Sequence, residues 1–494
     1  MILATVEPHG TALFLLVVGV LIALSVLFSR RIDRLGVPIV LLFLVLGMLG
    51  GSEGIGRIAF DDFGVAVRVG TIYLVLILFD GGMNTPWGAV RRVAVPAGIL
   101  ATVGVALTAG LLALFARVLG LGWTESLLLG AVVSSTDAAA VLAVLRGGRL
   151  HLQPRVGNTL EVESCANDPM AMILTVIMIE VAKSPDALRW TLALGVPLQL
   201  AIGAGVGLLA GYLGLRVIHR IRPPTVGLYP ALTLAIAFLS FGAATLLEGS
   251  GLLSVYVTAL VMGNSTLPYR SGLARVHESL AWLSQIALFL MLGLLVFPSH
   301  LLPVAGVGLA SALFLAFVAR PVAVVLCLLP IRLPAREVGY IAWIGLRGAV
   351  PIILGAFPVL AQVPGAERVF NIVFFIVVVS TILPGATIRA VTRWLRLAVP
   401  EKPSPSAILE VNSAHPLNGE IASFLIEPAA AVCEASLSQV QLPPDAAVIL
   451  VVRGSDLVAA RGHTVLMPGD HVYVFFRPAD RRYVELLFGR PESG

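Results

Sequence analysis

Charged residues are scarce in this chain: Asp, Glu, Lys and Arg together make up 12% of its 494 residues. Cysteine is rarer still, and the three cysteines are widely spaced and odd in number, which indicates neither a disulfide framework nor a zinc site. In contrast, 58% of the residues are hydrophobic and the mean hydropathy is +0.97. A water-soluble chain of this composition would aggregate, so the sequence predicts a membrane protein.

Apolar runs separated by Arg-, Pro- and Gly-rich breaks fill the chain up to residue 396. Since a bilayer core takes roughly 20 apolar residues per helix, these runs predict about thirteen transmembrane spans. Glu248-Gly249-Ser250-Gly251 fits either a tight turn or a break within one helix, which leaves about twelve spans as the alternative. The predicted spans are 9–28, 36–51, 64–82, 92–117, 123–146, 157–182, 190–218, 227–247, 250–264, 277–297, 302–329, 336–361 and 367–393.

Basic residues alternate between the predicted loops. The net charge of +5 therefore indicates membrane topology and not nucleic-acid binding. The basic loops hold Arg30, Arg31, Arg34, Arg91, Arg92, Arg146, Arg149, Arg155, Arg216, Arg220, Arg222, Arg270, Arg275, Arg332, Arg336, Arg389, Arg393 and Arg396, whereas the others hold little beyond Arg57, Arg117, Lys183, Arg189 and Arg368. By the positive-inside rule, the N-terminus lies outside a bacterial inner membrane and the C-terminus lies in the cytoplasm. Arg30, Arg31 and Arg34 follow the first span, the reverse of a secretory signal, so we expect that span to remain as a membrane helix.

The composition changes after residue 396. A Pro/Ser-rich stretch predicts a linker, and two β-rich runs around the turn Pro468-Gly469-Asp470 predict a small α+β domain that closes with a helix. The β-rich runs are 447–452 and 472–476, and the helix is 483–488. The predicted domains are a transmembrane domain over 1–396, a linker over 397–406, and a cytoplasmic regulatory domain over 407–494 with its core at about 427–488.

Three charged residues lie near the centres of predicted spans: Asp137, Asp168 and Arg347. They are about fourteen, twelve and eleven residues into their spans, so at about 1.5 Å per residue they reach a similar depth. Ionisable groups at the middle of a membrane are energetically costly and mark a functional site. The sequence therefore predicts a site for an ion or a proton at the midplane.

The residues around Asp168 favour a cation site. Ser164 and Asp168 share one helix face, and Glu163 and Asn167 share the adjacent face. Pro169 has no N–H to donate to the carbonyl of Cys165, which frees an oxygen beside the acid. Hard cations prefer such oxygen ligands, so we favour ion binding at Asp168 over a structural acid paired with an arginine.

Two predicted spans carry residues that interrupt helices. Hydroxyls in Ser134-Ser135-Thr136-Asp137 can satisfy unwound backbone in the fifth span, and Gly and Pro residues would break the twelfth span over 345–351. If the spans before and after the seventh are inverted repeats, these two form a pair, as in secondary transporters. Asp137 and Arg347 would then offset the half-helix dipoles, and we expect charge compensation from them more than direct ion contact. The predicted fold is an all-α polytopic membrane protein with inverted repeats and crossed broken helices.

Two further charged residues, Arg320 and Asp80, leave alternatives open. Arg320, just before Pro321, fits an architectural or a snorkelling side chain. Asp80, in Leu78-Phe79-Asp80-Gly81-Gly82 at a predicted cytoplasmic helix end, fits either an acid of an ion funnel or an exposed helix end. Glu161 is expected at the membrane interface.

Four motifs occur in order within the roughly 390 residues of the predicted transmembrane domain: Leu-Phe-Asp-Gly-Gly at 78–82, Thr-Asp at 136–137, Glu-Ser-x-x-Asn-Asp-Pro at 163–169 and Gly-Leu-Arg-Gly-Ala-Val-Pro at 345–351. Together they resemble the cation:proton antiporter-1 family of the NhaP type. The resemblance implies a secondary active antiporter and no enzyme, in which Asp168 binds a cation and a proton alternately. It also implies that Ser164 and the backbone near Thr136 contribute oxygens, and that Glu163, Asn167 and Arg347 form a supporting polar network. The pair Asn167-Asp168, in place of two aspartates, is similar to the electroneutral members.

The C-terminal region resembles a TrkA-C (RCK-C) regulatory domain through Ser436-Leu437, Leu442-Pro443, Val451-Val452-Arg453-Gly454 and Pro468-Gly469-Asp470. This combination is similar to potassium/proton antiporters of the cell-volume-regulation type. It implies K⁺ and H⁺ as substrates, no cofactor for transport, a regulatory nucleotide or ion at the C-terminal domain, and a homodimer in the lipid bilayer. The alternatives are a Na⁺/H⁺ antiporter with the same site, a cation channel gated by the cytoplasmic domain, and a membrane sensor. A channel is disfavoured because no Thr-Val-Gly-Tyr-Gly filter sequence occurs.

Overall fold

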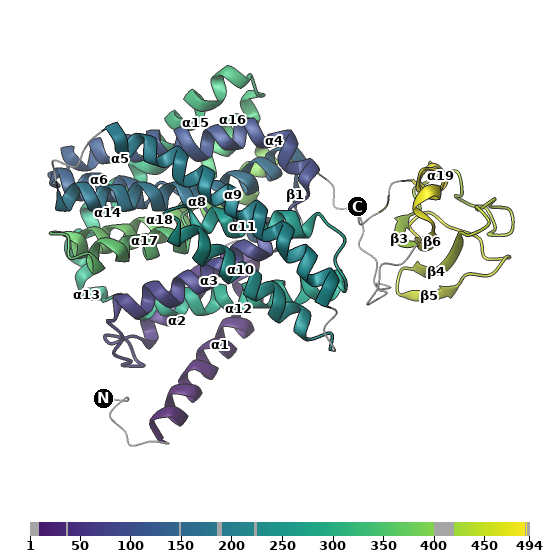
Figure 1. Ribbon diagram of the computed structural model, residues 1–494, viewed down its shortest axis with the longest axis horizontal. Coiled ribbons are helices and arrows are strands. Elements are labelled where there is room, and N and C mark those ends of the chain that lie inside the picture. Colours follow the sequence, from purple (N-terminus) through teal and green to yellow (C-terminus); the bar gives the residue numbers. More distant parts are fainter. Residues whose placement is uncertain are drawn as a thin grey trace. The chain divides into compact units, whose positions relative to one another are not determined.

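The computed structural model describes residues 9–35, 38–147, 150–184, 190–221, 225–399, 419–489 and 491. Internal contacts divide the chain into two units, one comprising 1–267 and 274–400 and the other comprising 268–273 and 401–494. The first unit is a bundle of helices, and the second contains a small sheet and one helix (Figure 1).

In the described part of the first unit, every predicted span coincides with a helix or with a pair of half-helices. Eight helices among the described residues are long and apolar enough to cross a membrane. The uninterrupted spans are α1 (His9–Leu35), α2 (Ile39–Gly50), α3 (Phe63–Asn84), α8 (Pro154–Lys183), α9 (Trp190–Ile221), α10 (Leu228–Leu246), α11 (Gly251–Gly263), α12 (Arg270–Leu294) and α18 (Ala366–Trp394). Two more spans are continuous but contain short π or 3₁₀ turns: Trp87–Val118, with α4 (Trp87–Ile99) and α5 (Val105–Val118), and Pro298–Ile331, with α13 (Pro298–Leu301), α14 (Ala305–Phe314) and α15 (Arg320–Leu328).

The ambiguous segment at Glu248 is a turn between two helices. Glu248 has a left-handed backbone with φ of 59°, and the Gly249 N–H donates to the Ala244 carbonyl at 2.8 Å. The Ser250 hydroxyl then caps α11 by accepting from the N–H of Leu253 at 3.4 Å. The alternative of one broken helix over this segment is therefore wrong.

The fifth and twelfth spans are broken, as predicted. The fifth consists of α6 (Trp123–Val132) and α7 (Ala138–Gly147), and the twelfth of α16 (Ala335–Trp343) and α17 (Ala349–Leu360). The two breaks meet, because the Asp137 N–H donates to the Leu346 carbonyl at 2.8 Å. Both half-helices after the breaks thus begin at one crossing point.

Glycines let α9 approach α11 closely. A Cβ atom at Gly203 would lie 2.5 Å from the Ser250 carbonyl oxygen, and one at Gly207 would lie 2.5 Å from that of Ser254. Real Cβ atoms do not approach so closely, so larger residues at these positions would push α11 away. The glycines therefore allow α11 to pack directly against α9, and α11 also contacts α3 and α8.

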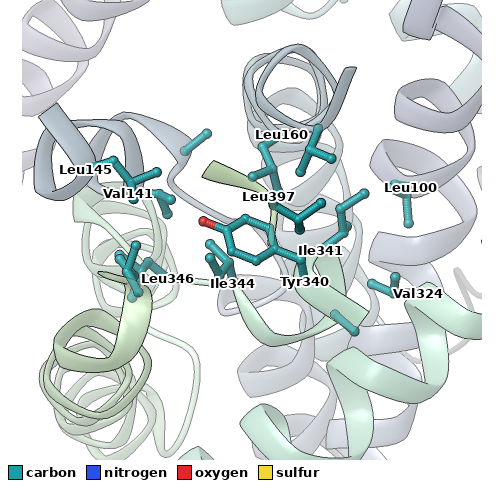
Figure 2. Close-up of a cluster of buried hydrophobic side chains, with 14 of the residues drawn as sticks. Leu100, Val141, Leu145, Leu160, Val324, Tyr340, Ile341, Ile344, Leu346 and Leu397 are labelled. Atoms are coloured by element: carbon teal, nitrogen blue, oxygen red, sulfur yellow. The ribbon is translucent and has the colours of Figure 1, made fainter. Parts of the chain in front are cut away.

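A buried apolar cluster packs α7, α8 and α16 together (Figure 2). Tyr340 of α16 lies within it and shares a hydrogen bond of 2.8 Å with the Thr392 hydroxyl of α18. Leu397 is fully buried in the same cluster, and β2 (Ala398–Val399) pairs antiparallel with β1 (His151–Leu152). The first three residues of the predicted linker 397–406 are thus packed against the helices, while 400–406 lie outside the described residues.

The second unit holds an antiparallel sheet with the order β3-β6-β4-β5. Its elements are β3 (Glu420–Leu425), β4 (Ala447–Arg453), β5 (Asp456–Ala459), β6 (His471–Phe476) and α19 (Arg481–Phe488). Phe424, Phe476 and Phe488 form the centre of its core. The predicted α+β class, both predicted strands and the closing helix are confirmed, whereas β3 and β5 were not predicted.

Candidate ion-binding site

Helix α8 carries most of the candidate residues. It runs without interruption over Pro154–Lys183 although Pro169 lies inside it. Glu163, Ser164, Asn167 and Asp168 are all buried, and 8% of Asp168 is exposed. Their spacing on one continuous helix places Ser164 one turn before Asp168, as predicted.

The side chains of Ser164 and Asn167 form hydrogen bonds with residues at the break of the fifth span. The Ser164 hydroxyl donates to the Thr136 carbonyl at 2.9 Å and accepts from the N–H of Ala138 at 3.1 Å. The Asn167 amide donates to the Thr136 hydroxyl at 2.6 Å. These bonds satisfy backbone groups that lack helical partners at the break. The Ser164 hydroxyl and the Thr136 carbonyl each retain one lone pair that could face a cation.

Asp137 lies at the start of two half-helices. Its carboxylate accepts from the N–H of Ala140 at 3.1 Å, which caps the N-terminus of α7. The other carboxylate oxygen lies against Gly348, the residue that precedes α17, so closely that a Cβ there would collide with it. Negative charge is stabilised at helix N-termini, so this geometry supports the charge-compensating role expected of Asp137.

Glu163 forms a buried ion pair with Arg320. The two distances between the guanidinium nitrogens and the carboxylate oxygens are 2.6 and 3.0 Å. The Arg320 side chain is 4% exposed and that of Glu163 is fully buried. The pair supports the architectural interpretation of Arg320, and the snorkelling alternative is wrong.

Arg347 lies near this pair. It is 1% exposed, and its three guanidinium nitrogens have no hydrogen-bond partner among the described residues. Its charged neighbours are Arg320 and Glu163, and it lines a void of about 10 Å³ with Arg320. A void of this size has room for about one water molecule. Of the expected network, Arg347 thus lies near Glu163, whereas the Asn167 amide bonds to Thr136 and Arg320 is the direct partner of Glu163.

A cavity of about 400 Å³ reaches Asp168. The acidic residues that line it are Asp80, Asp137, Glu161, Asp168 and Glu278. None of the described lining residues is basic, so we refer to it as the acidic cavity. Such a lining concentrates cations.

The acidic cavity contains residues that sequence reasoning placed elsewhere or overlooked. Asp80 accepts from the Asn84 side chain at 2.9 Å and lines the cavity, which supports the funnel interpretation. Glu161 lines it too, although we expected this residue at the membrane interface. Cys165 and Glu278 were not singled out, although the spacing of Cys165, three residues before Asp168 on one helix, was a usable signal.

Two family models match the chain. The model described as sodium/hydrogen exchanger, transmembrane, matches residues 18–394, and the TrkA-C domain matches residues 421–489. A solved structure of the sodium proton antiporter MjNhaP1 from Methanocaldococcus jannaschii at pH 8 is similar, with a TM-score of 0.64. The similarity covers 75% of this chain and 99% of that chain at 24% identity, a level that shows the fold alone.

Curated relatives match at higher identity. The chain is 41% identical over 470 residues to the K⁺/H⁺ antiporter NhaP of Alkalimonas amylolytica, covering 95% of this chain and 82% of that protein. It is 38% identical over 488 residues to the K⁺/H⁺ antiporter NhaP2 of Shewanella sp. strain ANA-3, covering 97% and 84%. At 95% and 97% of this chain, these matches extend over both units. The chain therefore belongs to the sodium/hydrogen exchanger family of membrane proteins.

Proposed function

We propose that this chain is a secondary active antiporter that exchanges K⁺ for H⁺ by alternating access. The observation that carries the exchange is Asp168, a buried carboxylate that lies beside a helix break and lines the acidic cavity. The preference for K⁺ rests on the two relatives named K⁺/H⁺ antiporters at 41% and 38% identity. Na⁺ is the alternative, supported by a relative named probable Na⁺/H⁺ antiporter 2 at 28% identity.

Asp168 differs from its acidic neighbours in its charge balance. Asp137 faces two half-helix N-termini, and Glu163 pairs with Arg320. Asp168 forms no ion pair with any described residue. A proton or a monovalent cation would therefore supply its missing positive charge, and Ser164 and Thr136 offer further oxygens for a cation.

Obligatory exchange follows from this difference. Moving an ionised carboxylate without a partner through the closed protein would cost on the order of several kcal/mol. The transporter therefore changes its facing state when Asp168 holds a proton or K⁺, and not when Asp168 is empty. One ion crosses in each direction and leak is suppressed.

One carboxylate at the site also sets the stoichiometry. Asn167 occupies the position beside Asp168, and its amide is engaged with Thr136. An amide takes up no proton near neutral pH, so Asp168 alone carries the proton at this position. We therefore infer an electroneutral exchange of one K⁺ for one H⁺.

The basic loops support an inward-facing orientation. Asn84 and Glu278 are exposed and line the cavity; Asn84 precedes Arg91 by seven residues, and Glu278 follows Arg275 by three, both arginines belonging to the basic set. By the positive-inside rule, the cavity opens to the cytoplasm of a bacterial inner membrane, with the N-terminus outside and the C-terminus inside. We further propose that the protein works as a homodimer and that a cytoplasmic nucleotide or ion regulates it through the C-terminal unit.

Ion gradients across proteoliposomes test the proposal. An outward gradient of K⁺ should drive H⁺ inward, as reported by a trapped pH dye, and an equal choline gradient should not. A response to Na⁺ with none to K⁺ would favour the alternative. No H⁺ movement with either cation would contradict antiport. Glu367 is an exposed acid at the start of α18, so Glu367→Gln should transport as the wild type does and is the control for variants of the site acids.

A further inference from the structure

A second polar cluster begins at Glu161, which lines the acidic cavity about two helical turns from Asp168 on α8. Glu161, Cys165 and Asp168 all line the cavity from α8. Glu161 and Asp168 are seven residues apart, so they share a helix face with a separation of about 10 Å along the axis. Glu161 lies toward the N-terminal end of α8, so an ion leaving Asp168 along this face would next meet Glu161.

Thr85 ties Glu161 to the end of α3. Thr85 is 2% exposed, and its hydroxyl lies 2.7 Å from the Gly81 carbonyl and 3.3 Å from a Glu161 carboxylate oxygen. The Thr85 carbonyl accepts from the Asn264 side chain at 2.9 Å, which fastens the end of α3 to the end of α11. The Thr85 hydroxyl is therefore held in place beside Glu161.

Tyr256 of α11 places a buried hydroxyl near Glu161. The residue is 5% exposed, and its hydroxyl is buried with no hydrogen-bond partner among the described residues. Its polar neighbours are the Thr85 hydroxyl, the Cys165 thiol and the Glu161 carboxylate. Buried phenol hydroxyls normally have a hydrogen-bond partner. The unused oxygen therefore indicates a missing ligand beside Glu161.

We propose that Glu161, at the wall of the acidic cavity, and the buried hydroxyls of Thr85 and Tyr256 beside it form an outer station for a monovalent cation. Glu161 supplies the charge, and the two hydroxyls supply neutral oxygens. A divalent ion would take more carboxylates than this single one, and an anion would meet only acidic residues in the described lining. The inference rests on the proposed K⁺/H⁺ exchange and names further residues that would serve it.

An outer station should act on capture of K⁺ and not on the exchange step. A cation held there is about two helical turns from Asp168, where it can replace a departing proton. We therefore expect Glu161→Gln to raise the KM for K⁺ about fivefold in proteoliposomes while the rate at saturating K⁺ changes less than twofold. Tyr256→Phe keeps the ring and removes the oxygen, so it should raise the KM about twofold to threefold.

Glu278→Gln distinguishes direct binding of K⁺ at the outer station from the electrostatic attraction of K⁺ by the acidic lining of the cavity. Glu278 is an exposed lining acid on α12, so its effect on KM should come from the field and disappear when choline chloride raises the ionic strength. The effects of Glu161→Gln and Tyr256→Phe should persist at high ionic strength. Gel filtration of each purified variant checks that it is folded.

Three results would overturn the outer station. One is a KM for Glu161→Gln that returns to the wild-type value at high ionic strength, as expected for Glu278→Gln. Another is an unchanged KM for a folded Tyr256→Phe variant. The third is a loss of rate at saturating K⁺ with no change in KM. A wild-type protein without K⁺-driven H⁺ movement would instead contradict the proposed function itself.

Discussion

The N–H of Asp137 donates to the carbonyl of Leu346 at 2.8 Å, and this bond joins the breaks of the two interrupted spans. The side chain of the same residue caps α7 through Ala140 and lies against Gly348 at the start of α17. One residue thus connects both half-helices to the wall of the acidic cavity. We therefore expect a movement of one break during transport to affect the other.

Gly348→Ala tests this crossing. The added methyl would collide with the Asp137 carboxylate, so either the carboxylate leaves its cap on α7 or α17 shifts. We expect K⁺-driven H⁺ transport to fall at least tenfold and the thermal midpoint of the detergent-solubilised protein to fall. Gly339→Ala on α16 is the matched control, because a Cβ there meets no atom within 4 Å. Equal activity of the two variants would contradict the close contact at Gly348.

The Glu163–Arg320 pair should behave as a structural pair. Removing one partner leaves a buried charge uncompensated, so Glu163→Gln or Arg320→Met alone should cost about 3–5 kcal/mol of stability. The double variant Glu163→Gln with Arg320→Met should recover much of this loss, as a double-mutant cycle of thermal unfolding would show. Additive losses in the double variant would mean that the two side chains act independently.

Transport should not respond to membrane potential. Exchange of one K⁺ for one H⁺ moves no net charge, so a voltage imposed across K⁺-loaded proteoliposomes should leave the H⁺ flux unchanged. Asn167→Asp adds a protonatable group beside Asp168 without adding a basic partner, and we expect its residual activity to become voltage-sensitive. A clear voltage dependence of the wild type would contradict the one-for-one stoichiometry.

Glu53 should make the loop between α2 and α3 sensitive to acid. Its carboxylate accepts hydrogen bonds from the hydroxyl and the N–H of Ser299, and these bonds lower its pKa. Because the folded pKa is depressed, the stabilisation is present above the unfolded value of about 4.3 and is lost as the pH falls through the folded pKa. Hydrogen exchange at the Ser299 amide should therefore accelerate in acid, after correction for the intrinsic rate. Glu53→Gln should remove this dependence, and an identical acid response in that variant would exclude Glu53 as its source.

The C-terminal unit should regulate transport without performing it. We expect it to supply no residue to the ion-binding site, because the described residues that line the site belong to the first unit. A chain ending near Lys402 should insert and still exchange K⁺ for H⁺, with a changed response to pH or to cytoplasmic ligands. Complete loss of exchange in an inserted truncation would show that residues 403–494 are needed for the transport cycle.

The helices and their breaks could be predicted because both depend on local sequence. Apolar runs of membrane length require helices, and the Gly and Pro residues at 345–351 interrupt one of them. The spacing within α8 likewise placed Ser164 beside Asp168 without knowledge of the fold. Those features need only the residues of one segment.

The partners between segments could not be predicted in this way. Arg320 and Glu163 are 157 residues apart, and hydropathy does not show which spans touch. Glu161 was expected at the interface because the sequence does not distinguish a helix face in lipid from one that lines a cavity. Tyr256 lies near Glu161 because α11 packs against α3 and α8, and the sequence does not show that packing.

Transport by Asp168→Asn tests the central claim most directly. The amide keeps the size of the side chain but can neither release a proton nor neutralise K⁺. The purified variant should elute as the wild type does in gel filtration, and a K⁺ gradient across its proteoliposomes should drive no H⁺ movement above the choline background. K⁺-driven H⁺ movement at the wild-type rate in that variant would contradict the assignment of Asp168 as the shared site for K⁺ and H⁺.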